Sequence, residues 1–376
     1  MNRSLGFTPV RWRAALNLAG VARTSGEVVR GLLEVLHKDG DAKVRGGTAW
    51  SLREAARTSE EVVQGLLKAL YKDEDVEVCR LAATSLREAA RTPGEAVQGL
   101  LDALYKDRNA KMRWGAAWSL KEAARTSEEA VRGLLEALNK DRNATVRSCA
   151  ALSLREAART SGEAVQGLLE ALNKDRNATV RMEAARSLTG IAATSVEVVK
   201  GLLEALQDGE AEVRNQAAES LAGAVEMSEE VVQRLLEALQ DREAEVRYQA
   251  AISLYKQGQR SIEITSLLLE AVRKAEAWMR REVVLFLSEM EPVEKATFDL
   301  IWQGLLDNDY DMREACVQAL TKLVEQYSVE QKEQFEKKII RALPTKKFEK
   351  TDEYGYPAYD SLYELLWRLV VGDASE

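Results

Sequence analysis

One unit of about 34 residues recurs along most of this 376-residue chain. The stretch GLLEALNKDRNATVR occurs twice, at 133–147 and 167–181, and glycine recurs every 34 residues at positions 31, 65, 99, 133, 167 and 201. Beyond position 201 the period shortens to 33. A Val-Arg or Met-Arg pair marks each copy, at 10–11, 44–45, 112–113, 146–147, 180–181, 213–214, 246–247, 279–280 and 312–313, and only Val78-Cys79 breaks it. Tandem units of this length indicate an architecture built by stacking.

Each unit reads as two helices. A Thr with a Glu three residues later, as in Thr58/Glu61 and Thr126/Glu129, predicts a capping box at the start of the first helix. In the unit at 126–158, the first helix carries one apolar stripe formed by Val131, Leu134, Leu135 and Leu138. That helix ends at the segment 140–143, where Asn143 is placed to cap the second helix.

The second helix has a face of small and branched apolar residues, namely Val146, Ala150, Leu154 and Ala157, with Ala151 and Ala158 beside it. A pair of helices cannot bury such a face alone, so neighbouring units must share one core. We therefore expect an all-α fold: an α-solenoid of about nine full repeats of 33–34 residues, plus end caps.

The two ends differ from the middle of the chain. Residues 8–22 match a second helix without its first, so the solenoid is expected to span 1–343, with full repeats from about residue 24. Either an unusual cap starts the chain, or the sequence is the C-terminal part of a longer protein. Residues 344–376 are expected to form a loop and a last helix near 358–371 that caps the same solenoid.

The spacing of charged residues resembles a known family. Asp141 lies six residues before Arg147, and Ala-x3-Leu follows that Arg. The pattern is similar to the HEAT-like repeat, in the short bacterial form related to phycobilisome-lyase repeats. The resemblance implies that these residues are structural and form a ladder between units through charge-assisted hydrogen bonds. The ladder would comprise Asp39/Arg45, Asp107/Arg113, Asp141/Arg147, Asp175/Arg181, Asp208/Arg214, Asp241/Arg247 and Asp307/Arg313, with interruptions where Cys79 replaces Arg and Lys274 replaces Asp.

Composition narrows the function classes. No run of 18 apolar residues and no secretory leader is apparent, so no membrane partner is expected. Three Cys and a single His argue against disulfides, a metal centre and a catalytic triad, and they favour a reducing, cytoplasmic location. No cofactor motif is present. Residues 1–193 carry 31 Lys and Arg against 25 Asp and Glu, while 194–376 carry 22 against 36, so the second half is acidic and disfavours nucleic acid along the whole length.

Comparing the repeats with each other locates the variable positions. The first, second and fifth residues after the marker pair change nearly every time, as at Ser148, Cys149 and Leu152. At about 100° per residue these three point away from the apolar face that contains Val146. Four of the seven Trp fall at such positions, although these rings could instead pack against each other or between helices. The predicted partner-binding residues are Trp12, Arg13, Leu16, Trp50, Arg80, Trp114, Trp118, Leu152, Met182, Arg186 and Tyr248.

These observations favour a non-enzymatic scaffold that recognises a protein or peptide along the concave face formed by the second helices. The resemblance adds the expectation of a sensor or interaction part of a larger bacterial signalling or defence protein. A nucleic-acid-binding HEAT-like protein using the basic N-terminal half is one alternative. A bilin-lyase-like chaperone and an engineered repeat array are others, although the irregular ends argue against the last.

Overall fold

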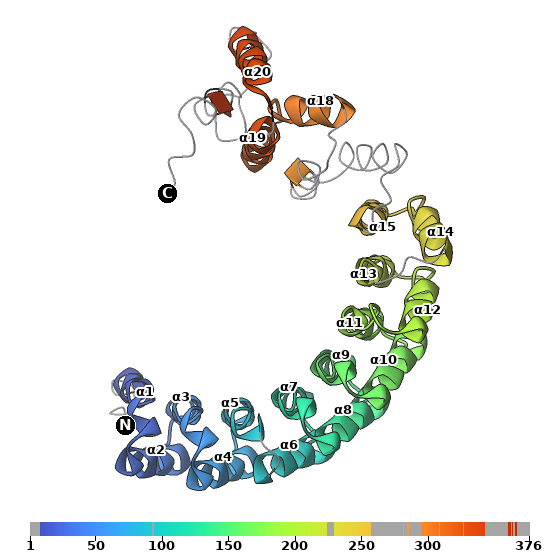
Figure 1. Cartoon of the computed structure of the whole chain (residues 1–376). Helices are drawn as coiled ribbons and strands as arrows, with labels where there is room; N and C mark the ends of the chain where they lie inside the picture. Colours follow the sequence, from blue (N-terminus) through green and yellow to red (C-terminus); the bar gives the residue numbers. More distant parts are fainter. Residues whose placement is uncertain are drawn as a thin grey trace. The chain divides into compact units, whose positions relative to one another are not determined.

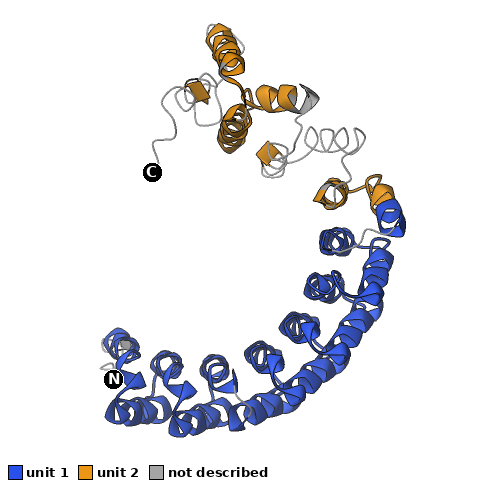
Figure 2. Ribbon diagram, in the orientation of Figure 1, with its two compact units in different colours: residues 1–234 blue, residues 235–376 orange. Residues whose placement is uncertain are grey.

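The computed structural model describes residues 8–91, 94–223, 229–256, 281, 284–285, 295–307, 309–325, 327–342, 360–361, 363 and 365–366. Every regular element assigned in these residues is an α-helix or a short 3-10 helix (Figure 1). The expected all-α solenoid is therefore confirmed, whereas the number of nine repeats stays a prediction. The chain divides into two compact units, residues 1–234 and 235–376 (Figure 2).

In the first unit the helices form two layers. The first helices of the repeats lie on the outer, convex side of the arc in Figure 1, and the second helices lie on its inner, concave side. The outer layer comprises α2 (Gly26–Lys38), α4 (Glu60–Lys72), α6 (Glu95–Lys106), α8 (Glu128–Lys140), α10 (Gly162–Lys174) and α12 (Val196–Ala205). The inner layer comprises α1 (Thr8–Asn17), α3 (Ala42–Ser51), α5 (Val76–Leu86), α7 (Ala110–Ser119), α9 (Ala144–Ser153), α11 (Ala178–Leu188) and α13 (Ala211–Leu221). Each inner helix packs against the next inner helix, and α1 packs against α3 in the same way.

The outer helices α4 and α8 begin one residue later than the sequence predicts. In α8 the N-cap is Ser127, whose hydroxyl accepts a hydrogen bond from the Ala130 N–H at 3.2 Å, and Thr126 ends the preceding 3-10 helix. The predicted capping box with Thr126 is therefore wrong, as is the equivalent one at Thr58, where Ser59 is the cap. The physical reason lies in the backbone, because an N-cap needs an extended conformation and only the Ser has one.

The inner helices are shorter than the apolar pattern implies. Helix α9 ends at Ser153, and a separate 3-10 helix, η5 (Ala157–Arg159), carries the last apolar residues. Equivalent 3-10 helices, η1 to η4, follow α1, α3, α5 and α7 at Val21–Arg23, Ala55–Arg57, Ala89–Arg91 and Ala123–Arg125. A Ser hydroxyl bonds the carbonyl four residues back near the end of α3 and α7, an arrangement that bends helices.

The predicted core is confirmed. Val146, Ala150, Leu154 and Ala157 are all buried, and the Asn143 side chain caps α9 by accepting from two backbone N–H groups. The recurring glycine of the outer helices has a packing role. At Gly133 an added Cβ would collide with the side chain of Leu101 from the preceding repeat, so glycine allows adjacent outer helices to approach closely.

Helix α14 (Glu229–Ala238) contains the boundary between the units, and the second unit continues with α15 (Ala244–Lys256), α18 (Lys295–Gly304), α19 (Tyr310–Glu325) and α20 (Val329–Ala342). Its core includes Ile301, Phe335, Ile339 and Leu365. Several predictions lie outside the described residues: Lys274, the marker pair 279–280, the boundary at 343/344 and most of the last helix. Among the described residues, no helix has the length and apolar character needed to cross a membrane.

Candidate functional site

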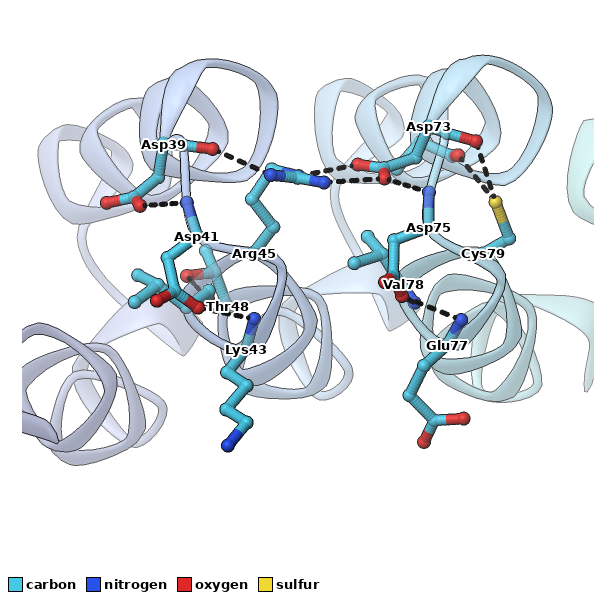
Figure 3. Close-up of polar contacts among 12 residues, drawn as sticks. Asp39, Asp41, Lys43, Arg45, Thr48, Asp73, Asp75, Glu77, Val78 and Cys79 are labelled. Carbon is cyan, nitrogen blue, oxygen red and sulfur yellow. Dashed lines mark hydrogen bonds and ion pairs between the residues drawn. The ribbon is translucent and has the colours of Figure 1, made fainter. Parts of the chain in front are cut away.

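The charged residues of the turns join successive repeats. Arg45 donates from Nε and Nη2 to the two carboxylate oxygens of Asp73, in the next repeat, at 2.8 and 2.9 Å (Figure 3). Its Nη1 donates to the backbone carbonyl of Asp39, in its own repeat, at 2.9 Å. One largely buried guanidinium therefore fixes the turns of two repeats against each other.

The same arrangement recurs along the first unit. Arg113 pairs with Asp141, Arg147 with Asp175 and Arg181 with Asp208, and each Arg also donates to the Asp carbonyl six residues before it. The backbone-carbonyl bond recurs in Arg214, Arg247 and Arg313, which donate to Asp208, Asp241 and Asp307. At the start of the unit, Arg11 pairs with Asp39 at 2.8 Å.

The ladder affects the acid–base properties of its carboxylates. Burial alone would raise the pKa of Asp175, but the hydrogen bonds from Arg147 and from the Asn177 N–H, with the positive charge of Arg147, outweigh burial. The pKa of Asp175 is therefore lowered, and the pKa values of Asp73, Asp141 and Asp208 are lowered in the same way. These carboxylates are charged partners of the ladder and have no feature of a proton-transfer group.

The ladder has a gap at Cys79. The Cys79 thiol donates to the backbone carbonyl of Asp73 at 3.3 Å, in place of the guanidinium found in other repeats (Figure 3). In the described residues the carboxylate of Asp107 accepts the Asn109 N–H at 2.7 Å and no guanidinium from the preceding repeat. Asp73 was absent from the predicted ladder because its own repeat lacks the Arg, yet its position 34 residues after Asp39 was the available signal.

A groove opens on the inner layer between α1, α3 and α5. It has a volume of about 1020 Å³, and its lining includes Pro9, Trp12, Leu16, Trp50 and Leu81. The Trp12 and Trp50 side chains are 40% and 41% exposed, which is unusual for the largest apolar side chain. Three carboxylates (Asp41, Asp75 and Glu77) and one ammonium (Lys43) also line this N-terminal groove.

Two glycines shape the groove. A Cβ at Gly47 would lie 2.5 Å from Trp12 Cδ1, and a Cβ at Gly46 would lie 2.9 Å from Leu81 Cδ1. The indole of Trp12, from the half repeat, therefore rests directly on the backbone of α3. Residues with a side chain at these positions would push Trp12 and Leu81 out of their places.

The other two inner tryptophans stack on each other. The rings of Trp114 and Trp118 are 6.0 Å apart between centroids and nearly parallel, at 6°. Arg87 and Lys121 lie over Trp118, with 5.8 and 5.4 Å to the ring centroid. Both indoles are still half-buried rather than buried, so part of each remains on the surface.

The remaining predicted partner-binding residues are scattered. Arg13 on α1 is exposed, and Leu16, Arg80, Leu152, Met182, Arg186 and Tyr248 are half-buried. Arg80 is held by Glu77, and Arg186 bonds Glu183 and Gln216. The structure thus brings Trp12, Leu16 and Trp50 together in one groove and Trp114 with Trp118 in one stack. Tyr248 belongs to the second unit.

The second variable position is buried in some repeats and not in others, since Arg13 is exposed and Leu81 is half-buried. Gly47, Gly115, Cys149 and Gln216 are buried, which contradicts the direction predicted for Cys149. Cys149 lies only about 60° around the helix from Val146, and its Sγ is 3.6 Å from the backbone oxygen of Trp114. In these four repeats the second position therefore packs against the preceding inner helix.

A family model described as HEAT repeats matches residues 63–155, 97–189, 165–255 and 232–321. The chain belongs to the HEAT-repeat family. No curated protein sequence matches the chain.

Several solved structures share the HEAT-repeat fold. One is Kap95p, from a structure of its complex with RanGDP, with a TM-score of 0.61, 15% identity, and coverage of 96% of this chain and 53% of that one. Another is a homology model of the full-length AP-3 complex in an intermediate open conformation, with a TM-score of 0.56, 15% identity, and coverage of 98% of this chain and 73% of that one. A third is importin beta, with a TM-score of 0.53, 12% identity, and coverage of 99% of this chain and 61% of that one. This HEAT-repeat chain therefore spans only part of these relatives, about half of the first.

The three cysteines of this HEAT-repeat protein are free and buried. Burial raises the pKa of Cys79 to about 11 and that of Cys149 to about 12, and it also raises that of Cys316. All three are therefore thiols, not thiolates, at neutral pH, and a thiol is a poor nucleophile. Among the described residues, no cluster of three or more His, Cys, Asp or Glu is placed to hold a metal ion.

Proposed function

We propose that this HEAT-repeat protein is a non-enzymatic interaction scaffold that binds a protein or peptide on the inner layer of its first unit. The anchoring side chains are Trp12, Trp50, Trp114 and Trp118. The observation that carries the proposal is the pair of indoles, Trp12 and Trp50, that stand about two-fifths exposed in one groove. Exposed tryptophan is unfavourable in water, and Trp is among the residues that contribute most to protein interfaces.

The similar structures support the same role at the level of the fold. Two of them concern protein complexes, of Kap95p with RanGDP and of AP-3. A cytoplasmic location and a place in a larger bacterial signalling or defence protein belong to this proposal as well.

The alternatives receive less support from the geometry. A bilin-lyase-like chaperone would need an exposed reactive cysteine or a pigment-binding groove, and burial keeps the three thiols protonated. The N-terminal groove carries more carboxylates than cations, so it would repel the phosphates of a nucleic acid. No observation in the described residues favours an engineered array.

The experiment is a selection of displayed 12-residue peptides on the immobilised chain, with a counter-screen against variants. We expect enriched peptides that bind the wild type and lose at least tenfold in affinity to Trp50→Ala or to Trp114→Ala/Trp118→Ala. Arg159→Ala is the matched surface control, because Arg159 is exposed on a 3-10 turn away from the inner tryptophans. Peptides that bind every variant equally would show that the inner surface is not the binding surface.

A further inference from the structure

The N-terminal groove combines two kinds of surface. Its floor is apolar and aromatic, formed by Trp12, Leu16, Trp50 and Leu81. Its lining also holds Asp41, Asp75 and Glu77 against a single cation, Lys43. An apolar floor favours an apolar side chain, and the excess of carboxylates favours a positive charge next to it.

We propose that the N-terminal groove binds a peptide segment in which an aromatic or large aliphatic residue is adjacent to an arginine or lysine. This inference rests on the proposed function and names the chemistry of its partner at one place. The apolar side chain lies on the floor between the two indoles. The cation of the neighbouring residue pairs with the carboxylates, first of all with that of Asp75.

Asp75 is the carboxylate best placed for this pairing. Its Oδ1 caps α5 by accepting the backbone N–H groups of Glu77 and Val78 at 2.9 and 3.2 Å. In the described residues its Oδ2 accepts no hydrogen bond, and no guanidinium or ammonium pairs with it. Glu77, by contrast, already pairs with Arg80. The groove therefore holds a fixed negative charge that no guanidinium or ammonium of the described residues binds directly, although Arg45, bonded to Asp73, interacts with it electrostatically.

The floor is pre-organised for an apolar side chain. Trp12 rests on the Gly47 backbone, where a Cβ would collide with its ring. Arg53 lies over Trp50, 4.6 Å from the ring centroid, and is itself bonded to Glu54 at 3.0 Å. Both indoles are thus supported on one side by the protein, which reduces the ordering that binding requires.

The test uses three capped octapeptides, Ac-GSGFRGSG-NH2 and its Phe-Glu and Ala-Arg counterparts. Each is titrated into the ¹⁵N-labelled chain, and the indole N–H signals are followed by NMR after assignment of Trp12 and Trp50 with Trp→Phe variants. We expect the Phe-Arg peptide to shift the Trp12 and Trp50 signals and to bind at least fivefold more tightly than either counterpart. Its affinity should also fall as salt concentration rises, because the pairing is exposed to solvent.

Two variants isolate the two surfaces. Asp75→Asn keeps a side-chain oxygen that can cap α5 but removes the charge. It should lower the affinity for the Phe-Arg peptide at least threefold. The affinity for the Phe-Glu peptide should stay unchanged or rise slightly. Gly47→Ala should displace the Trp12 ring and so lower the affinity for both Phe-containing peptides. Arg159→Ala, at an exposed position outside the groove, should leave all three affinities unchanged.

The outcomes separate this inference from the proposed function. Equal binding of the Phe-Arg and Phe-Glu peptides, or no effect of Asp75→Asn, would overturn the inference. The proposed function would still stand in that case if displayed peptides lost binding to the tryptophan variants. If none of the octapeptides shifts the Trp12 or Trp50 signal and displayed peptides ignore the tryptophan variants, both are overturned.

Discussion

The ladder arginine is the residue on which the stacking of these repeats depends most. Arg147 and Asp175 are 6% and 9% exposed, and the guanidinium also holds the carbonyl of Asp141. We expect Arg147→Leu to lower the free energy of unfolding by about 3 kcal/mol, because it leaves a buried carboxylate without its partner. Urea unfolding followed by circular dichroism measures this, with Arg159→Leu as the exposed control that should change little.

The repeat that lacks its arginine offers the reverse substitution. Cys79→Arg restores the residue found at this place in the other repeats and supplies a partner for the Asp107 carboxylate. The charge-assisted hydrogen bonds should raise the free energy of unfolding by about 1.5 kcal/mol. The same urea experiment checks it, and a decrease in stability would mean that the space around Cys79 has adapted to the thiol.

The lowered pKa values of the ladder aspartates predict a dependence of stability on pH. The folded pKa values of Asp73, Asp141, Asp175 and Asp208 lie below that of an unfolded Asp, about 3.9. A depressed folded pKa gives stability that is complete above the unfolded value and is lost as pH falls through the folded values. Urea midpoints measured from pH 6 to pH 2.5 should therefore fall mainly below pH about 4. The Arg147→Leu variant should lose less stability over this pH range than the wild type. An equal loss would contradict the role of the ladder aspartates in the pH dependence.

For the individual helices, the sequence predicts which face is buried better than it predicts where each helix begins and ends. The apolar positions of the unit at 126–158 are buried as their spacing predicts, because burial follows directly from helical periodicity. The starts of α4 and α8 differ from the prediction because Thr and Ser are adjacent and both can cap. Only the backbone conformation, which the preceding 3-10 helix sets, decides between Thr126 and Ser127.

The corrected helix start leads to a matched pair of substitutions. Ser127→Ala removes the acceptor for the Ala130 N–H and should lower the free energy of unfolding by about 1 kcal/mol. Thr126→Ala, one residue away and exposed, should change it by less than about 0.5 kcal/mol. The urea midpoints of the two variants show which residue caps α8. A larger effect of Thr126→Ala would mean that Thr126 is the cap, as the sequence predicts.

At the scale of the molecule, the repeat predicts the architecture, but the groove could not be predicted from one repeat. The groove exists because Trp12 of the half repeat lies on Gly47 of the next, a contact between units that differ in sequence. The same limit explains the error at Cys149. Viewed on one helix its side chain points partly away from the core, but the preceding inner helix covers it. Periodicity within a repeat predicts the direction in which a side chain points, whereas its exposure to solvent depends also on the neighbouring repeat.

We propose that the inner tryptophans form a binding surface and are not required for packing. The most direct measurement is the affinity of a display-selected peptide for Trp50→Ala, taken together with the unfolding free energy of the same variant. We expect an affinity at least tenfold weaker and a loss of stability below about 2 kcal/mol, less than the 3–5 kcal/mol typical of a fully buried Trp. Unchanged affinity, or a loss of stability typical of a buried Trp, would contradict it.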